Sequence, residues 1–324
     1  MSSSHMPVPL APSLVLHPDG ITEEGHTILL DSKGECIARN IEALGSNMIF
    51  SLTWQGWILS LNRDDFRTML CNPHTLEKIE LPRLVAHQLP RDFECALSDK
   101  PTSVGCVVVA LHPDDTCFWY CHIGGHEWIK YDYDVGSQQY DVKGLVWKKI
   151  IIDHLTPCKG KFYFPISYLK HGVLEFDPSP KTHIMTLQGL PTVVPPNPYG
   201  YRAHTCNFEL DNEPCRFFAY FYEDRKVVTS IALYKMDVAR QQWYEVDEIG
   251  DRALLWSGYR GGCCSATRFG LEPNCVYWIS QDDSSMHIFN IVENTERVCY
   301  HPSEDLPRLS SEAFWLLPSN STIN

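Results

Sequence analysis

Two groups of cysteine and histidine residues are the first candidates for metal chemistry. The first group comprises Cys117, Cys121, His122 and His126, and the second is the adjacent pair Cys263 and Cys264. On a strand, residues four positions apart are separated by about 13 Å, and adjacent residues point to opposite faces of the sheet. Zinc needs all of its thiolate ligands within about 2.3 Å. We therefore expect these side chains to pack in the core, and we predict no metal and no cofactor.

Three pairs of adjacent aspartates could act as general acids or bases. The pairs are Asp64-Asp65, Asp114-Asp115 and Asp282-Asp283. Each lies between two apolar runs, where a hairpin turn is expected, so we interpret them as solvated turns. The sequence contains no G-x-S-x-G, H-E-x-x-H or P-loop motif, and the glycine-rich segment Gly258 to Gly262 lacks the Lys-Ser/Thr of a phosphate loop. The sequence predicts a conformationally special loop there and no enzyme.

Two segments combine tyrosine and arginine with glycine or proline. They are Pro195 to Arg202 (PPNPYGYR) and Ser257 to Gly262 (SGYRGG). Tyrosine and arginine are enriched at interaction hot spots, and glycine and proline shape loops. The residues that we predict to bind a partner are Tyr199, Tyr201, Arg202, Tyr259 and Arg260.

Charge excludes some classes of partner. The 324 residues include 27 Lys and Arg against 40 Asp and Glu, which gives a formal net charge of −13. Such a field repels phosphate backbones and anionic lipids, so we expect no nucleic acid, no membrane and a protein partner with a basic surface. The 13 cysteines include no C-x-x-C motif, which favours free thiols in a reducing compartment, the cytoplasm or the nucleus.

Short apolar runs predict the elements that must position these residues. Runs rich in β-branched and aromatic residues recur between Gly, Pro, Asn and Asp, for example Val104 to Leu111, Thr116 to His122 and Cys215 to Tyr222. Many are uninterrupted, which indicates strands covered on both faces. The sequence therefore predicts an all-β fold, with most aromatic side chains packed between sheets.

A repeat organises these strands. An apolar strand ends in Asn, Asp or His, a polar turn follows, and a second strand comes after the turn. The strand ends are Asn72, His122, Asp177, Asp237 and Asn290. Asn and Asp side chains favour such turns because they accept hydrogen bonds from backbone groups two residues later. Repeats of about 40 to 50 residues with four strands are typical of propeller blades. We predict a β-propeller of six four-stranded blades, with seven as the alternative.

The two ends of the chain are predicted to form one blade together. Leu14 to His17, Thr27 to Leu30 and Glu35 to Arg39 supply three strands, and Ala313 to Leu317 supplies the fourth. This pairing closes the ring, because it covers the open edges. Residues 1–6 (MSSSHM) are typical of a sequence added by cloning, residues 7–318 are predicted to be one propeller domain, and residues 319–324 a disordered tail.

The segment from Leu233 to Ser280 carries a signature. Its matching residues are Leu233, Tyr234, Lys235, Asp237, Trp243, Glu245, Val246, Gly250 to Leu254, Ser265, Ala266, Gly270, Pro273 to Cys275 and Tyr277. In these residues the chain resembles the plant F-box-associated, KIB-type β-propeller family (domain of unknown function two-nine-five), over roughly residues 14 to 318. The resemblance implies a kelch-like propeller that recognises substrates for Skp1–Cullin–F-box ubiquitin ligases.

Family members commonly carry an F-box, a helical hook for the Skp1 adaptor, ahead of the propeller. The residues before the first complete repeat read as strands here, so we expect no F-box and no Skp1-type adaptor. Our hypothesis is a non-enzymatic protein-interaction module. The alternatives are a hydrolase or lyase with a site in the central channel, and a propeller that binds a small molecule or RNA.

Overall fold

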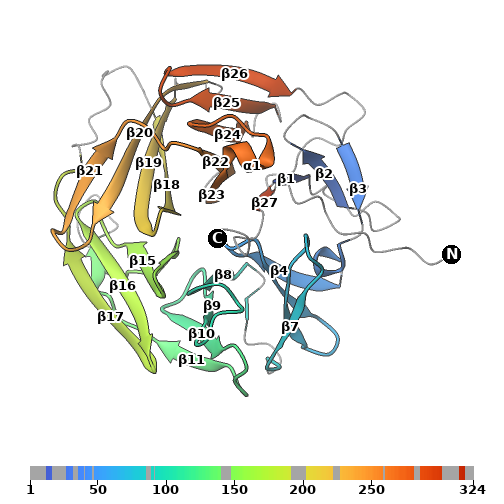
Figure 1. The fold of residues 1–324 in the computed structure, drawn as a ribbon. Helices are drawn as coiled ribbons and strands as arrows, with labels where there is room; N and C mark the ends of the chain where they lie inside the picture. Colours follow the sequence, from blue (N-terminus) through green and yellow to red (C-terminus); the bar gives the residue numbers. More distant parts are fainter. Residues whose placement is uncertain are drawn as a thin grey trace.

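The fold is a ring of twisted sheets (Figure 1), in which neighbouring strands are antiparallel except for the parallel pair β22 and β24. The computed structural model describes residues 12–16, 27–31, 36–39, 41–45, 47–84, 89–90, 92–139, 147–190, 202–221, 227–257, 260–280, 285–300 and 314–317. The strands are short, and most alternate with turns that contain Gly, Asn or Asp, as the sequence predicts.

We number the sheets in chain order. Sheet I contains, in spatial order, β27 (Phe314–Leu316), β1 (Ser13–Leu16), β2 (Thr27–Asp31) and β3 (Cys36–Arg39). After the short 3-10 helix η1 (Glu42–Leu44), sheet II contains β4 (Met48–Leu52), β5 (Ile58–Asn62), β6 (Thr68–Cys71) and β7 (Lys78–Leu81). Sheet III contains β8 (Glu94–Leu97), β9 (Val107–Leu111), β10 (Cys117–His122) and β11 (Ile129–Asp132).

A two-stranded ribbon of β12 (Ser137–Gln139) and β13 (Trp147–Lys149) precedes the next sheet. Sheet IV contains β14 (Thr156–Cys158), β15 (Lys161–Pro165), β16 (Lys170–Asp177) and β17 (Ser179–Thr186). Sheet V contains β18 (Arg202–Leu210), β19 (Glu213–Phe221), β20 (Val228–Asp237) and β21 (Gln242–Val246). Sheet VI contains, in spatial order, β23 (Arg260–Ser265), β22 (Arg252–Ser257), β24 (Cys275–Ile279), β25 (Met286–Asn290) and β26 (Thr295–Tyr300), with α1 (Ala266–Phe269) between β23 and β24.

The prediction of a propeller is confirmed, but six four-stranded blades, and the alternative of seven, are wrong. In the described residues, five sheets have four strands and sheet VI has five. The extra strand is β23, which includes the glycine-rich residues that we expected to form a loop. Gly262 of this strand packs closely against Leu317, because a Cβ atom at this position would collide with the leucine side chain.

The two ends of the chain pair as expected. β27 lies antiparallel to β1, with Leu14 opposite Trp315. Clusters of buried side chains then join sheet I to both of its neighbours: Leu14 and Trp315 pack against sheet VI, and Val15 and Phe314 pack against sheet II. The strands from the two termini therefore link the first and last repeats.

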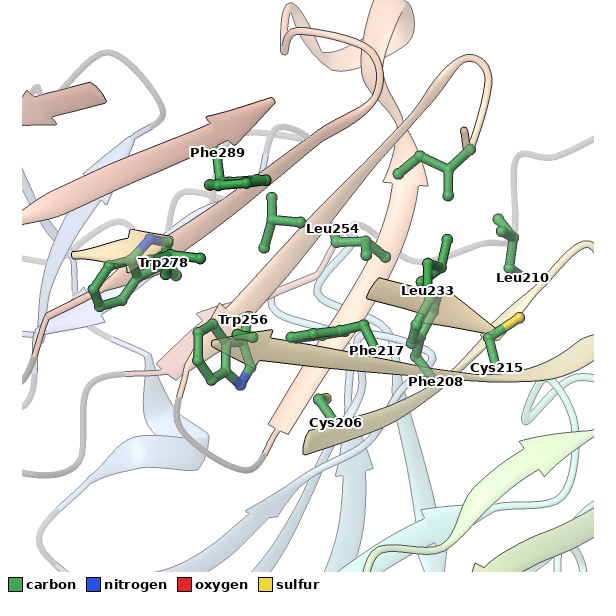
Figure 2. Close-up of a cluster of buried hydrophobic side chains, with 14 of the residues drawn as sticks. Cys206, Phe208, Leu210, Cys215, Phe217, Leu233, Leu254, Trp256, Trp278 and Phe289 are labelled. Atoms are coloured by element: carbon green, nitrogen blue, oxygen red, sulfur yellow. The ribbon is translucent and has the colours of Figure 1, made fainter. Parts of the chain in front are cut away.

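Aromatic side chains fill the space between sheets, which confirms the core interpretation. Figure 2 shows the cluster between sheets V and VI, where Phe217 and Trp256 lie close together. Their ring centroids are 5.3 Å apart and the rings are perpendicular, the edge-to-face arrangement that aromatic pairs favour. This packing fixes each sheet relative to the next, and so fixes the turns at the centre of the ring.

The strand ends identified in the repeat lie where the prediction places them. Asn72 follows β6, and its Oδ1 accepts hydrogen bonds from the backbone N of His74 (2.9 Å) and Thr75 (3.1 Å). Asp237 and Asn290 end β20 and β25 and accept bonds from backbone N atoms three residues later. Asn and Asp therefore form these turns through their side chains.

Candidate binding pocket at the centre of the ring

A cavity of about 400 Å³ lies where turns from four sheets meet two strands of a fifth. It is lined by Trp54, Gln55, Ser98, Asp99, Lys100, Pro157, Cys158, Lys159, Glu209, Leu210, Asp211, Asn212, Arg252 and Cys263. These residues belong to the turns that leave β4, β8, β14 and β18, and to β22 and β23. In Figure 1, β18 lies nearer the centre of the ring than β19, β20 and β21. The volume falls in the range typical of ligand pockets, about 300 to 1,000 Å³.

Two tight hairpin turns build part of the rim. Asp211 and Asn212 connect β18 to β19 with φ angles of 54° and 64°. Lys159 and Gly160 connect β14 to β15 with φ angles of 51° and 76°. Positive φ at both central residues defines the type I′ turn, which favours Asn, Asp and Gly. Lys159 is therefore an unusual choice, which marks this rim position as one where the lysine side chain has a use.

Trp54 lines the pocket and contacts other parts of the ring. It lies in the turn between β4 and β5, and its Nε1 donates to the carbonyl oxygen of Leu155, 2.8 Å away in the segment before β14. The indole also packs against the cluster between sheets V and VI, and lines a smaller space of about 40 Å³. Trp54 thus contacts distant parts of the ring and separates the larger cavity from the smaller one.

Gln55 leaves one acceptor beside the pocket. Its Nε2 donates to the carbonyl oxygen of Leu97 at 3.0 Å, which fixes the orientation of the amide group. Its Oε1 is buried and has no hydrogen-bond partner among the described residues. A buried acceptor without a partner costs free energy, so the bond from Nε2 to Leu97 holds this amide at a cost.

A charge network orders one wall of the pocket. Nη2 of Arg252 lies 2.9 Å from Oδ1 of Asp211. Nζ of Lys235 lies 3.7 Å from Oδ2 of Asp211 and 3.4 Å from Oε2 of Glu213. Two basic residues from different strands therefore hold the β18–β19 turn in place.

Glu209 lies on the same wall but has a different environment. Its Oε1 accepts a hydrogen bond from the backbone N of Asn212, and no described cation forms an ion pair with it. Burial raises the pKa of this carboxyl group, Asp211 raises it further, and Arg252 and Lys235 lower it. The pocket thus contains a half-buried carboxylate whose charge is incompletely compensated.

The thiols at the pocket are poor nucleophiles. Burial raises the pKa of Cys158 to about 12 and also raises the pKa of Cys263. Only the thiolate attacks or binds metal, so these groups are protonated and unreactive at neutral pH. Within the described segments, no group of three or more His, Cys, Asp or Glu residues is placed to hold a metal ion. No helix of the described chain is long and apolar enough to span a membrane.

The expectation that the first cysteine and histidine group packs in the core is right for its cysteines and wrong for its histidines. Cys117 and Cys121 are both buried on β10, in different core clusters, whereas His122 is half-buried and His126 is exposed. Cys263 lines the pocket and Cys264 packs in the core, on the opposite face of β23. Asp64-Asp65 and Asp114-Asp115 lie in the turns after β5 and β9, whereas Asp282-Asp283 fall outside the described residues.

Two of the five residues predicted to bind a partner lie on described strands. Arg202 begins β18, whose other end leads into the pocket turn, and Arg260 begins β23. A strand of nine residues is about 30 Å long, so the backbone of Arg202 is distant from the turn at Asp211. Tyr199, Tyr201 and Tyr259 lie outside the described residues. The role of these five residues in partner binding remains a prediction.

The signature segment does contribute to the pocket, and this signal could have identified it. Lys235 and Arg252, both in the signature, converge on Asp211. Other signature residues support the fold. Asp251 accepts hydrogen bonds from Ser265 Oγ and Thr267 N at the start of α1, and Oδ1 of Asn274 accepts from the backbone N of Ile249.

Comparisons with known proteins agree with this architecture. The profile of the KIB1-4 beta-propeller family matches residues 32–296. The F-box/kelch-repeat protein At1g57790 of Arabidopsis thaliana is 23% identical over 272 residues, which cover 81% of this chain and 70% of that protein.

Two solved structures have a similar course of the chain. Apo AztD from Citrobacter koseri is 11% identical, with a TM-score of 0.37 and 89% of this chain and 94% of that chain covered. The Cps50 (Swd1) beta-propeller domain from Myceliophteria thermophila is 10% identical, with a TM-score of 0.38 and coverage of 91% and 87%. At these TM-scores, neither structure carries an argument about function. The family profile spans most of the chain, and so the protein belongs to the KIB1-4 beta-propeller family.

Proposed function

We propose that this protein is a non-catalytic protein-interaction module that recognises substrates in the manner of Skp1–Cullin–F-box ligases. The observation that carries the proposal is the pocket at the centre of the ring, to which turns from four sheets and two strands of a fifth contribute. Propellers commonly bind through such turns, because the rigid sheets hold short, variable segments in fixed positions.

The chemistry of the pocket supports binding over catalysis. Its charged side chains are ordered by ion pairs such as Arg252–Asp211, and its thiols are protonated at neutral pH. Preorganised charges give specificity and orientation to a protein contact. The names of the family and of the Arabidopsis relative also point to a non-catalytic propeller.

The ligase part of the proposal rests on the relative, whose name includes an F-box. Free cysteines, 12 of them described, are consistent with a reducing compartment, and we place the protein in the cytoplasm or nucleus. A fluorescent fusion in plant cells tests this location, and a secreted product would contradict it.

Affinity capture from plant extract tests the function. The test variant reverses two exposed rim charges, Asp99→Lys with Lys159→Glu. The matched control reverses the exposed pair Asp177→Lys with Lys181→Glu on sheet IV, whose charged atoms lie 3.9 Å apart. We expect wild type and control to retain the same proteins and the rim variant to lose them.

Equal capture by the rim variant, or no reproducible protein at all, would contradict the proposal. A Skp1-type adaptor among the captured proteins would support the ligase role and overturn the expectation that no adaptor binds. If another partner is captured through the rim and no Skp1-type adaptor is found, the role would be limited to recognition of that partner.

A further inference from the structure

One carboxylate at the pocket is only partly paired. Glu209 uses Oε1 to accept from Asn212 N, and no described cation or donor occupies its Oε2. The residue is half-buried and lines the cavity of about 400 Å³.

The two cations that lower the pKa of Glu209 are committed to other carboxylates. Arg252 binds Asp211, and Lys235 lies between Asp211 and Glu213. Glu209 therefore keeps a charge in a half-buried place with only distant compensation. Burial of a carboxylate is unfavourable unless a positive group pairs with it.

We propose that the pocket receives a basic side chain, arginine or lysine, from a partner protein, with Glu209 as the carboxylate that pairs with it. The inference rests on the proposed function, because it assumes that the ligand is a protein. A guanidinium group offers five N–H donors in a planar fork, which suits pairing with the free Oε2 of Glu209. The aliphatic part of the side chain can pack against Trp54, which lines the same cavity.

The rim lysines give the pocket selectivity. Lys100 is half-buried, Lys159 is exposed, and neither forms an ion pair within the described residues. They repel a second positive charge beside the first, so an isolated basic residue is preferred over a basic run. They also supply a competing prediction: if the pocket were built for an anion, these lysines would bind it.

Short peptides distinguish the two cases. The probes are acetylated and amidated Gly-Arg-Gly, the same peptide with citrulline, and Gly-Glu-Gly. Citrulline keeps the shape of arginine and removes its charge. Binding is followed through the indole N–H signal of Trp54 in proton–nitrogen NMR spectra, assigned by its loss in Trp54→Phe. We expect the arginine peptide to bind and the citrulline and glutamate peptides to bind at least about tenfold more weakly.

Two variants should change the affinity in opposite directions. Glu209→Gln keeps the shape of the side chain and should lower the affinity for the arginine peptide about tenfold or more. Lys159→Ala removes a like charge from the rim and should raise that affinity. Unchanged thermal unfolding of both variants shows that they fold. Equal binding of the arginine and citrulline peptides, no effect of Glu209→Gln, or weaker binding to Lys159→Ala would overturn the inference.

The outcome is separable from the proposed function. Arginine binding that depends on Glu209, without any captured partner, would leave the pocket chemistry standing and count against the interaction role. If partners are captured through the rim but the arginine peptide does not bind, the interaction role stands and the inference about the pocket is wrong.

Discussion

Nε2 of His171 accepts a hydrogen bond from Nη2 of Arg216 at 2.9 Å, between sheets IV and V. A guanidinium group only donates, so the histidine is neutral and carries its proton on Nδ1. Arg216 is itself buried, donates from Nε to Oδ1 of Asn207 at 2.7 Å, and lies over the ring of Trp243. Arg216 thus places a positive charge between the two sheets, and this charge disfavours protonation of His171.

This relationship predicts a loss of stability in acid. Burial and the charge of Arg216 lower the pKa of His171 to about 3, whereas histidine in an unfolded chain titrates near 6.5. As the pH falls below about 6.5 the unfolded chain binds a proton that the folded chain does not, so stability falls progressively down to about pH 3. Between pH 7 and about pH 5 we expect protonation of this histidine in the unfolded chain to lower the free energy of unfolding by about 2 kcal/mol.

Urea unfolding at the two pH values measures the loss. His171→Gln should show a smaller difference between them than wild type, by about the same 2 kcal/mol. His183→Gln, which changes an exposed histidine on β17, should behave as wild type. An equal pH dependence in wild type and His171→Gln would refute the assignment.

Trp54 should stabilise the fold through both a hydrogen bond and packing. Trp54→Phe removes the Nε1–H group that donates to the carbonyl oxygen of Leu155, and should lower the free energy of unfolding by about 1 kcal/mol. Trp54→Ala should lower it by about 3 to 5 kcal/mol. Trp147→Phe is the control, because Trp147 is 63% exposed and should change stability by less than about 0.5 kcal/mol. Similar unfolding midpoints for all three variants would show that Trp54 does not hold the ring together.

Gly172 on β16 should tolerate no side chain. A Cβ atom there would fall inside the ring of Phe164, its neighbour on β15. We expect Gly172→Ala to cost about 1 to 3 kcal/mol by overpacking. Adding Phe164→Leu should make space for the new methyl group, so the double variant should be more stable than the sum of the single effects predicts. Strictly additive free energies of unfolding would contradict this account.

The turn after β6 should depend on its asparagine more than the turn after β25 does. Oδ1 of Asn72 accepts two backbone hydrogen bonds, whereas Oδ1 of Asn290 is shown accepting one. We expect Asn72→Ala to lower the free energy of unfolding by about 1 to 3 kcal/mol, and Asn290→Ala to lower it by about half as much. Chemical denaturation compares them, and a larger loss for Asn290→Ala would be the contrary result.

The repeat could be read from the sequence because its signals are local. Alternating apolar runs and the turn residues Asn72, Asp237 and Asn290 act within a few positions of the chain, and the structure places all three at strand ends. The pairing of β1 with β27 could also be inferred, because open sheet edges are unfavourable in a closed ring. The fifth strand of sheet VI could not, because Gly262 of β23 packs against Leu317, 55 positions later in the sequence.

The all-β class, the repeat, the family and the acidic charge can all be read from the chain alone. Which polar residues meet depends on how the sheets pack. Gln55, Lys159, Glu209 and Arg252 come from different sheets, and each alone reads as an ordinary turn or strand-end residue. They share one pocket because packing between sheets brings the turns to one centre, and packing between distant segments leaves no periodic trace in the chain.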